Sequence, residues 1–151
     1  MNDPLIIAAR LERQLQPAPI NPAWIRSGSP RARYAHVAGS ADGRALTCLW
    51  ECSAGEFDWH YDLEETVYVL DGSVVLESES LPPTRYGAGD VIFFKRGATV
   101  RWYVEDHIRK LAFCRWRPES ILRRAARVVQ RRLRAIQSAP RAIPASWTPA
   151  H

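Results

Sequence analysis

Two stretches of this sequence decide its fold: Glu65-Thr-Val-Tyr-Val-Leu-Asp-Gly72 and Gly87-Ala-Gly89-Asp90-Val-Ile-Phe-Phe-Lys-Arg-Gly97. Each contains a run of apolar, β-branched or aromatic residues closed by a glycine turn, and this pattern is typical of a buried strand. The proline-containing segment just before Gly87 is predicted to be a turn. Together the two stretches predict neighbouring strands of a β-rich core.

Further runs of the same kind surround these two stretches. Their even spacing, with turn residues between them and no helical period, predicts a single all-β sandwich or small barrel. In one run Cys48, Trp50 and Cys52 alternate on one face, and we expect them in the core. The expected strands are residues 44–52, 56–61, 66–70, 73–79, 90–94, 99–104 and 110–116, preceded by extended chain over 24–40.

The two ends of the chain follow a helical period instead. Asp3 and Pro4 suit a helix start, and apolar residues recur at helical spacing to about Gln14, after which three prolines form a linker. A second stripe of apolar residues, with arginines between them, predicts a basic amphipathic helix over 118–137. The predicted organisation is therefore a helix and linker over 1–19, a barrel over 20–117, and a helix with an irregular tail over 118–151.

The net charge of +5 is concentrated at the C-terminal end. Residues 1–114 carry 12 lysines and arginines against 15 acidic residues, a balance of −3. Residues 115–151 carry 9 arginines against Glu119 alone, a balance of +8. Contact with nucleic acid or with an anionic membrane surface is therefore expected only of the helix over 118–137, and we favour packing of its apolar stripe over both.

The cellular compartment follows from two observations. The apolar run over residues 5–9 is too short to cross a membrane and has no basic segment before it, so we expect neither a signal peptide nor a transmembrane helix. The three cysteines have no metal-ligand spacing and an odd count, which favours a reducing compartment. We therefore expect a cytoplasmic protein.

The glycines of the two opening stretches resemble the motifs of the cupin superfamily. The first cupin motif is written G-x5-H-x-H-x3,4-E-x6-G, and Glu65 and Gly72 match its closing half. The second is written G-x5-P-x-G-x2-H-x3-N; Gly89 and Gly97 match its glycines, whereas Val100 stands where its histidine is expected. The resemblance implies the barrel, while most of the histidine ligands are missing.

A narrower resemblance covers about residues 20–115. It is to the cupins named for (S)-ureidoglycine aminohydrolase and to the ethanolamine-utilisation cupin, and it implies a single-domain, RmlC-like jelly-roll barrel that is often a homodimer. The aminohydrolase itself is a two-cupin protein with a metal site, so this chain has half its length and lacks its ligand set. The segments that carry the resemblance are residues 50–55, 57–61, 64–72, 88–90, 102–105 and 109–113.

The spacing in the first motif leaves a metal hypothesis open. With four residues between the second histidine position and Glu65, the two histidine positions fall at Asp58 and His60; with three residues between, they fall at Trp59 and Tyr61. In the first register Asp58, His60 and Glu65 would form a metal site with fewer ligands than the family has, suited to Mn²⁺, Fe²⁺ or Zn²⁺. Such a metal would suit hydrolysis of ureidoglycine-like amide or ureido compounds. The other interpretation, which we favour, is a hydrogen-bonded Asp58–His60 pair at the mouth of the barrel.

A metal-free barrel is the second hypothesis, and we place it slightly above the first. Trp102 shares strand parity with Val100, so its indole is expected to fill the space of the missing ligand. An interior with aromatic walls and few polar groups suits a small polar metabolite. Catalysis is not assigned, and a structural or regulatory partner-binding role is a third alternative. The candidate pocket residues are Asp58, His60, Glu65, Tyr68 and Trp102.

Overall fold

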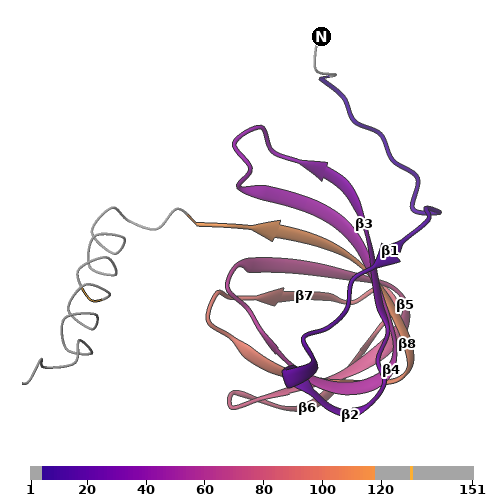
Figure 1. The fold of residues 1–151 in the computed structure, drawn as a ribbon, viewed down its shortest axis with the longest axis vertical. Coiled ribbons are helices and arrows are strands. Elements are labelled where there is room, and N and C mark those ends of the chain that lie inside the picture. Colours follow the sequence, from indigo (N-terminus) through magenta and orange to yellow (C-terminus); the bar gives the residue numbers. More distant parts are fainter. Residues whose placement is uncertain (1–4, 118–129, 131–151) are drawn as a thin grey trace, which may run out of the picture. The chain divides into compact units, whose positions relative to one another are not determined.

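The computed structural model describes residues 5–117 and 130. In residues 5–117 strands are the dominant structure, and they curve around one interior (Figure 1). The helix predicted over 118–137 and the tail after it lie outside the described residues. The elements are β1 (Gln16–Pro17), the 3-10 turn η1 (Pro22–Trp24), β2 (Ile25–Gly28), β3 (Ala32–Gly39), β4 (Ala45–His60), β5 (Glu64–Ser78), β6 (Leu81–Gly87), β7 (Val91–Phe94) and β8 (Thr99–Arg115).

All strand pairs are antiparallel, and strands dominate residues 5–117, which confirms the predicted all-β class. The strand order is β1-β3-β4-β8-β5-β6, with β2 paired to β4 and β7 paired to β5. β4 and β8 form the longest ladder, which extends from the pair Ala45–Arg115 to the pair His60–Thr99. Within the described part of the chain, no helix is long and apolar enough to span a membrane.

Three strands are longer than the sequence pattern suggested. The runs 44–52 and 56–61 form the single strand β4, because a register shift between Ser53 and Gly55 keeps the two halves in one ladder. In the same way the runs 66–70 and 73–79 belong to β5, and the runs 99–104 and 110–116 belong mostly to β8. Residues with turn chemistry therefore mark bulges here and not strand ends.

Two predictions of local structure were wrong. Residues 5–14 are not helical, and Leu5, Ile6 and Leu11 are exposed. A helix of this length needs a surface against which its apolar face can pack, and these side chains have none. The proline-containing segment before Gly87 was predicted as a turn but forms β6, which lies at the edge of the sheet, where missing proline donors are tolerated.

A second bulge region lies where β5 bends over β8. The register shifts between Val69 and Asp71 and again between Gly72 and Val75. Gly72 has a φ of 73°. A Cβ atom built on Gly72 would lie 2.1 Å from the carbonyl oxygen of His107. Glycine is therefore required at this crossing both by the backbone conformation and by the close approach of β8.

His107 holds the same bend from the solvent side. Its Nε2 atom lies 2.8 Å from Asp71 and its Nδ1 atom lies 3.0 Å from Asp106. Both ring nitrogens donate only in the protonated imidazole, and the hydrogen bonds to Asp106 and then to Asp71 raise the pKa of His107 above its ordinary value.

The stability of the protein is expected to fall slightly as the pH rises above neutrality. A raised folded-state pKa means that the contribution of His107 is complete below its unfolded pKa and disappears as the pH passes through the folded pKa. The side chains are exposed, so the effect will be small and will weaken with salt. The unfolding midpoint measured against pH should show this slope in the wild type and lose it in His107→Gln; an equal slope in both would contradict the assignment.

Candidate functional site

The inner face of β4 changes parity at its bulge, and this decides which residues line the barrel. Before the bulge, Trp50 and Cys52 point inward and are buried, whereas after it the inward residues are Phe57, Trp59 and Tyr61. Gly55 allows the bulge, because a Cβ atom there would lie 2.7 Å from the ring of Pro30. The three-residue count from Glu65 is therefore the one that faces the interior.

An aromatic cluster fills this interior. The ring of Trp102 lies 5.9 Å from those of Trp50 and Phe94 and stacks on Phe57 at 6.0 Å. Tyr61 stacks on Phe94 with a centroid distance of 4.3 Å. Rings at these separations pack favourably with one another and exclude water from the centre of the barrel.

One ion pair lies among these rings. Lys110 Nζ donates to Glu65 Oε1 at 2.5 Å, and both residues are less than a tenth exposed. The ammonium lies 4.8 Å from the ring centroids of both Trp50 and Trp102. A buried charge is tolerated only when it is paired, so the carboxylate and the two indole faces together keep Lys110 inside.

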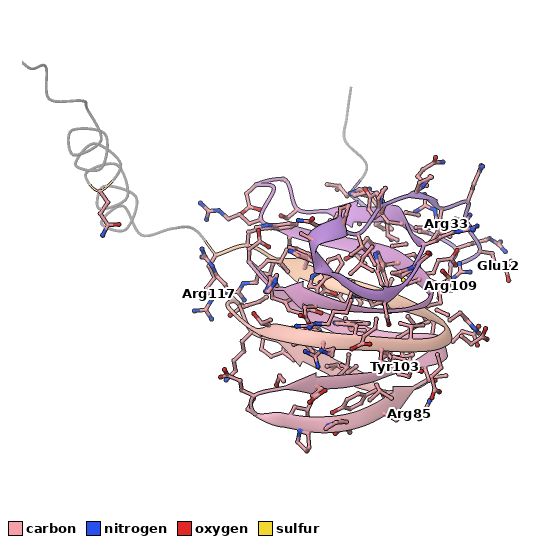
Figure 2. The ribbon with its side chains drawn as sticks, turned by 60° about the horizontal axis from the view of Figure 1, so that its bottom comes forward. Glu12, Arg33, Arg85, Tyr103, Arg109 and Arg117 are labelled. Carbon is pink, nitrogen blue, oxygen red and sulfur yellow. The ribbon has the colours of Figure 1, made fainter. Side chains whose placement is uncertain are left out.

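The outer face of the barrel has a different character. Charged side chains point away from it, among them Arg33, Arg85 and Arg109 (Figure 2). Arg33 and Arg109 both approach Glu51, at 3.0 Å and 3.8 Å. These pairs are solvent-accessible and contribute little to stability, which sets them apart from Glu65 and Lys110 in the interior.

Two polar atoms beside the ion pair have no hydrogen-bond partner among the described residues: Tyr61 Oη and Trp102 Nε1. The two side chains are buried, at 3% and 1% exposed. Burial, reinforced by the charge of Glu65, raises the pKa of Tyr61 well above its ordinary value. The indole of Trp102 offsets a part of this rise, although the two groups do not reach hydrogen-bonding geometry.

A cavity of about 610 Å³ opens from this centre to one end of the barrel. Glu65 and Lys110 border it together with His60 and Asp62, and four tryptophans stand among its mainly apolar lining residues. Its size and apolar character match those of pockets for small organic molecules. The wall tryptophans are Trp24, Trp50, Trp59 and Trp116.

The predicted metal group is not assembled. Asp58 follows the β4 bulge on the outer face, where Arg26 Nε donates to it at 2.7 Å and Arg101 Nε donates to it at 3.2 Å. Burial alone would raise the pKa of Asp58, but these two hydrogen bonds lower it below its ordinary value. Within residues 5–117, no three His, Cys, Asp or Glu side chains lie close enough to hold a metal ion.

His60, Tyr68 and Trp102 take three different positions. His60 is exposed, borders the cavity beside the ring of Trp24, and contacts Thr99 Oγ1 through Nδ1 at 2.9 Å. Tyr68 is 41% exposed on the outer face of β5. Trp102 lies in the interior as expected, behind Lys110. The predicted hydrogen bond between Asp58 and His60 is therefore not formed: Asp58 accepts from two arginines, and His60 contacts Thr99.

Lys110 and Tyr61 were not among the predicted pocket residues. Lys110 shares its strand parity with the apolar residues Ala112 and Cys114, and this charge on an otherwise apolar face is the signal that could have identified it. Tyr61 was named only in the alternative register. Recognising it required the position of the β4 bulge.

Comparisons with known proteins agree with this fold. A family model described as the EutQ-like cupin domain matches residues 39–112. No curated protein sequence matches the chain.

Solved structures give the same result. A protein of unknown function from Pseudomonas syringae, of the DUF861 family, superposes with a TM-score of 0.63 at 22% identity, over 68% of this chain and 45% of that chain. The EutQ protein of Clostridium difficile gives 0.50 at 20% identity, over 58% and 64%. A predicted oxalate decarboxylase from Thermotoga maritima gives 0.56 at 17% identity, over 75% and 100%. This chain therefore spans less than two thirds of the first two proteins, and identities at this level support the fold alone.

Proposed function

We propose that this chain, whose residues 39–112 match the EutQ-like cupin model, binds a small metabolite in its barrel and does so without a metal ion. One observation carries the proposal. The ammonium of Lys110 is paired with Glu65, the glutamate of the first cupin motif. The carboxylate that would bind a metal ion therefore binds a lysine instead. The cavity above this pair is large enough for a small organic molecule.

The residues at the cupin ligand positions do not fit a metal ion. In the register that faces inward, the two histidine positions of the first motif hold Trp59 and Tyr61, and the histidine position of the second holds Val100. Divalent metals require several nitrogen, oxygen or sulfur donors, and the one carboxylate at these positions, Glu65, already binds Lys110. The alternative of a metal-dependent amide or ureido hydrolase therefore has less support, and we derive no catalytic step.

Two further expectations remain proposals. Cys48, Cys52 and Cys114 are free thiols, which supports a reducing compartment such as the cytoplasm. A homodimer is supported by neighbouring exposed apolar side chains on the outer sheet face, where Tyr68 pairs with Val91 and where Phe93 and Phe113 flank Thr66.

The binding proposal is tested by screening small organic fragments against the protein in the presence of a chelator. The indole N–H signals of the wall tryptophans are followed by NMR. Fragments are expected to shift these signals in the wild type, because the cavity is formed without metal. A double variant, Lys110→Met with Glu65→Gln, removes the ion pair while keeping side chains of similar length and is expected to weaken the binding of polar fragments. Absence of any fragment that shifts these signals would contradict the proposal.

A further inference from the structure

Two of the three cysteines lie together on the wall of the cavity. Cys48 is part of β4 and Cys114 is part of β8; both border the cavity, and each is 8% exposed. They belong to one buried cluster with Ala112, and both are free thiols. A small molecule in the cavity therefore meets two thiols that come from neighbouring strands.

The strand register decides how these two sulfurs can be joined. In the ladder between β4 and β8, Cys48 lies opposite Ala112, and Leu46 lies opposite Cys114. The two cysteines are therefore diagonal neighbours on the same face of the sheet. Diagonal neighbours are about 7–8 Å apart, whereas the α-carbons of a disulfide are about 4.4–6.8 Å apart. A direct S–S bond would need the strands to move, but one atom that binds both sulfurs fits the separation.

The ion pair of Glu65 and Lys110 acts differently on the two thiols. Glu65 lies opposite Cys114 in the ladder between β5 and β8. The hydrogen bond with Cys48, burial and the charge of Glu65 raise the pKa of Cys114. The hydrogen bond from Cys114, assisted by the charge of Lys110, lowers the pKa of Cys48 against the effect of burial. Cys48 is therefore the better nucleophile, and Cys114 keeps its proton.

These protonation states restrict the bridging atom. A Cu⁺ ion would need two thiolates and would leave a net negative charge in the apolar wall beside Glu65. A Zn²⁺ ion would need about four donors, and in the described chain no third His, Cys, Asp or Glu side chain joins the pair. A trivalent arsenical takes up two neutral thiols and releases water, so no charge is left behind.

From this geometry we propose that Cys48 and Cys114 form a covalent binding site for trivalent organoarsenicals. The sulfur of Cys48 attacks the arsenic of R–As(OH)₂ first, and the sulfur of Cys114 follows. Each As–O bond is replaced by an As–S bond, and each thiol proton leaves with a hydroxide as water. Arsenic stays trivalent, so the step needs no oxidant or reductant. The organic group R remains in the cavity beside the aromatic lining residues, among them Trp50 and Trp59.

Phenylarsine oxide is the probe for this site. Full-length protein, reduced beforehand with a phosphine, is expected to form an adduct with one arsenical per chain, followed by native mass spectrometry. The dithiol 2,3-dimercaptopropanol should remove the arsenical, whereas the monothiol 2-mercaptoethanol should not. Cys48→Ala and Cys114→Ala each leave a single thiol, and each is expected to weaken the binding at least about a hundredfold, because the second As–S bond of the pair forms within one molecule.

Cys52→Ala is the matched control, because Cys52 lies on the same strand as Cys48 but belongs to the cluster around Trp102. It is 2% exposed, and burial raises its pKa to about 12. Its removal should leave the affinity for phenylarsine oxide unchanged. A measurement on the wild type alone covers the case in which a variant does not fold. Iodoacetamide should alkylate Cys48 at least about tenfold faster than Cys52, and the arsenical should protect Cys48 and Cys114 from this reaction.

The outcomes decide the proposal. An adduct that depends on both Cys48 and Cys114 and persists in Cys52→Ala supports it. An adduct that depends on one cysteine only, or that 2-mercaptoethanol removes, overturns the paired site, and so does the absence of any adduct with the reduced wild type. Fragment binding is judged separately by the indole shifts, so the metabolite proposal stands or fails independently of these results.

Discussion

Replacing Gly72 by alanine is expected to destabilise the protein by about 4 kcal/mol. Two costs add at this position. The φ of 73° is unfavourable for any residue with a Cβ atom, and that atom would lie 2.1 Å from the carbonyl oxygen of His107. The obstacle is backbone of β8, which pairs with both β4 and β5, so it cannot move without breaking ladders. Urea denaturation of the wild type and the variant measures the difference.

Gly43→Ala is the matched control for this substitution. Gly43 has nearly the same conformation, with a φ of 68°, but a Cβ atom there meets nothing within 4 Å. The control should therefore cost only about 1 kcal/mol, the conformational part of the penalty. If the two alanine variants were equally stable, the close approach of His107 to Gly72 would be contradicted.

Replacing Lys110 by methionine is expected to cost about 3–5 kcal/mol, because it leaves the carboxylate of Glu65 buried without its partner. The methionine keeps most of the volume, so the loss is electrostatic and not a packing defect. Lys95, the other lysine of the chain, is exposed, and Lys95→Met should change the stability by no more than about 0.5 kcal/mol. Denaturant midpoints of the two variants give the comparison.

A second substitution separates the charge from the packing. Adding Glu65→Gln to Lys110→Met removes the unpaired charge, and the double variant should recover most of the lost stability. If the double variant were as unstable as the single one, lost packing against Trp50 and Trp102 would be the cause. The ion pair would then not be the feature that organises the interior.

The barrel could be predicted from local sequence, whereas the residues of the site could not. Gly72, Gly89 and Gly97 all have positive φ angles, and such positions are marked in the sequence by glycine itself. The inward register of β4 depends instead on a bulge held against Pro30, which is distant along the chain. For that reason the sequence led to Asp58 and His60 as pocket candidates, whereas Trp59 and Tyr61 are the residues that face inward.

The partner of Glu65 illustrates a second limit. Alternation along β8 is compatible with an inward Lys110, but the sequence alone does not tell which of 15 acidic residues in the first 114 it meets. The pair joins strands through the register in which Glu65 lies opposite Cys114 and Val69 lies opposite Lys110. Pairing of this kind is a property of sheet register and becomes visible only with the whole ladder.

The central claim is that the cavity bordered by the Lys110–Glu65 pair binds its ligand without a metal ion. The most direct test compares the affinity of the tightest-binding fragment in chelator with its affinity after dialysis of the protein against Mn²⁺, Fe²⁺ or Zn²⁺. The structure predicts equal affinities in all four conditions. Binding that disappears in chelator and returns with one of the metals would contradict the claim.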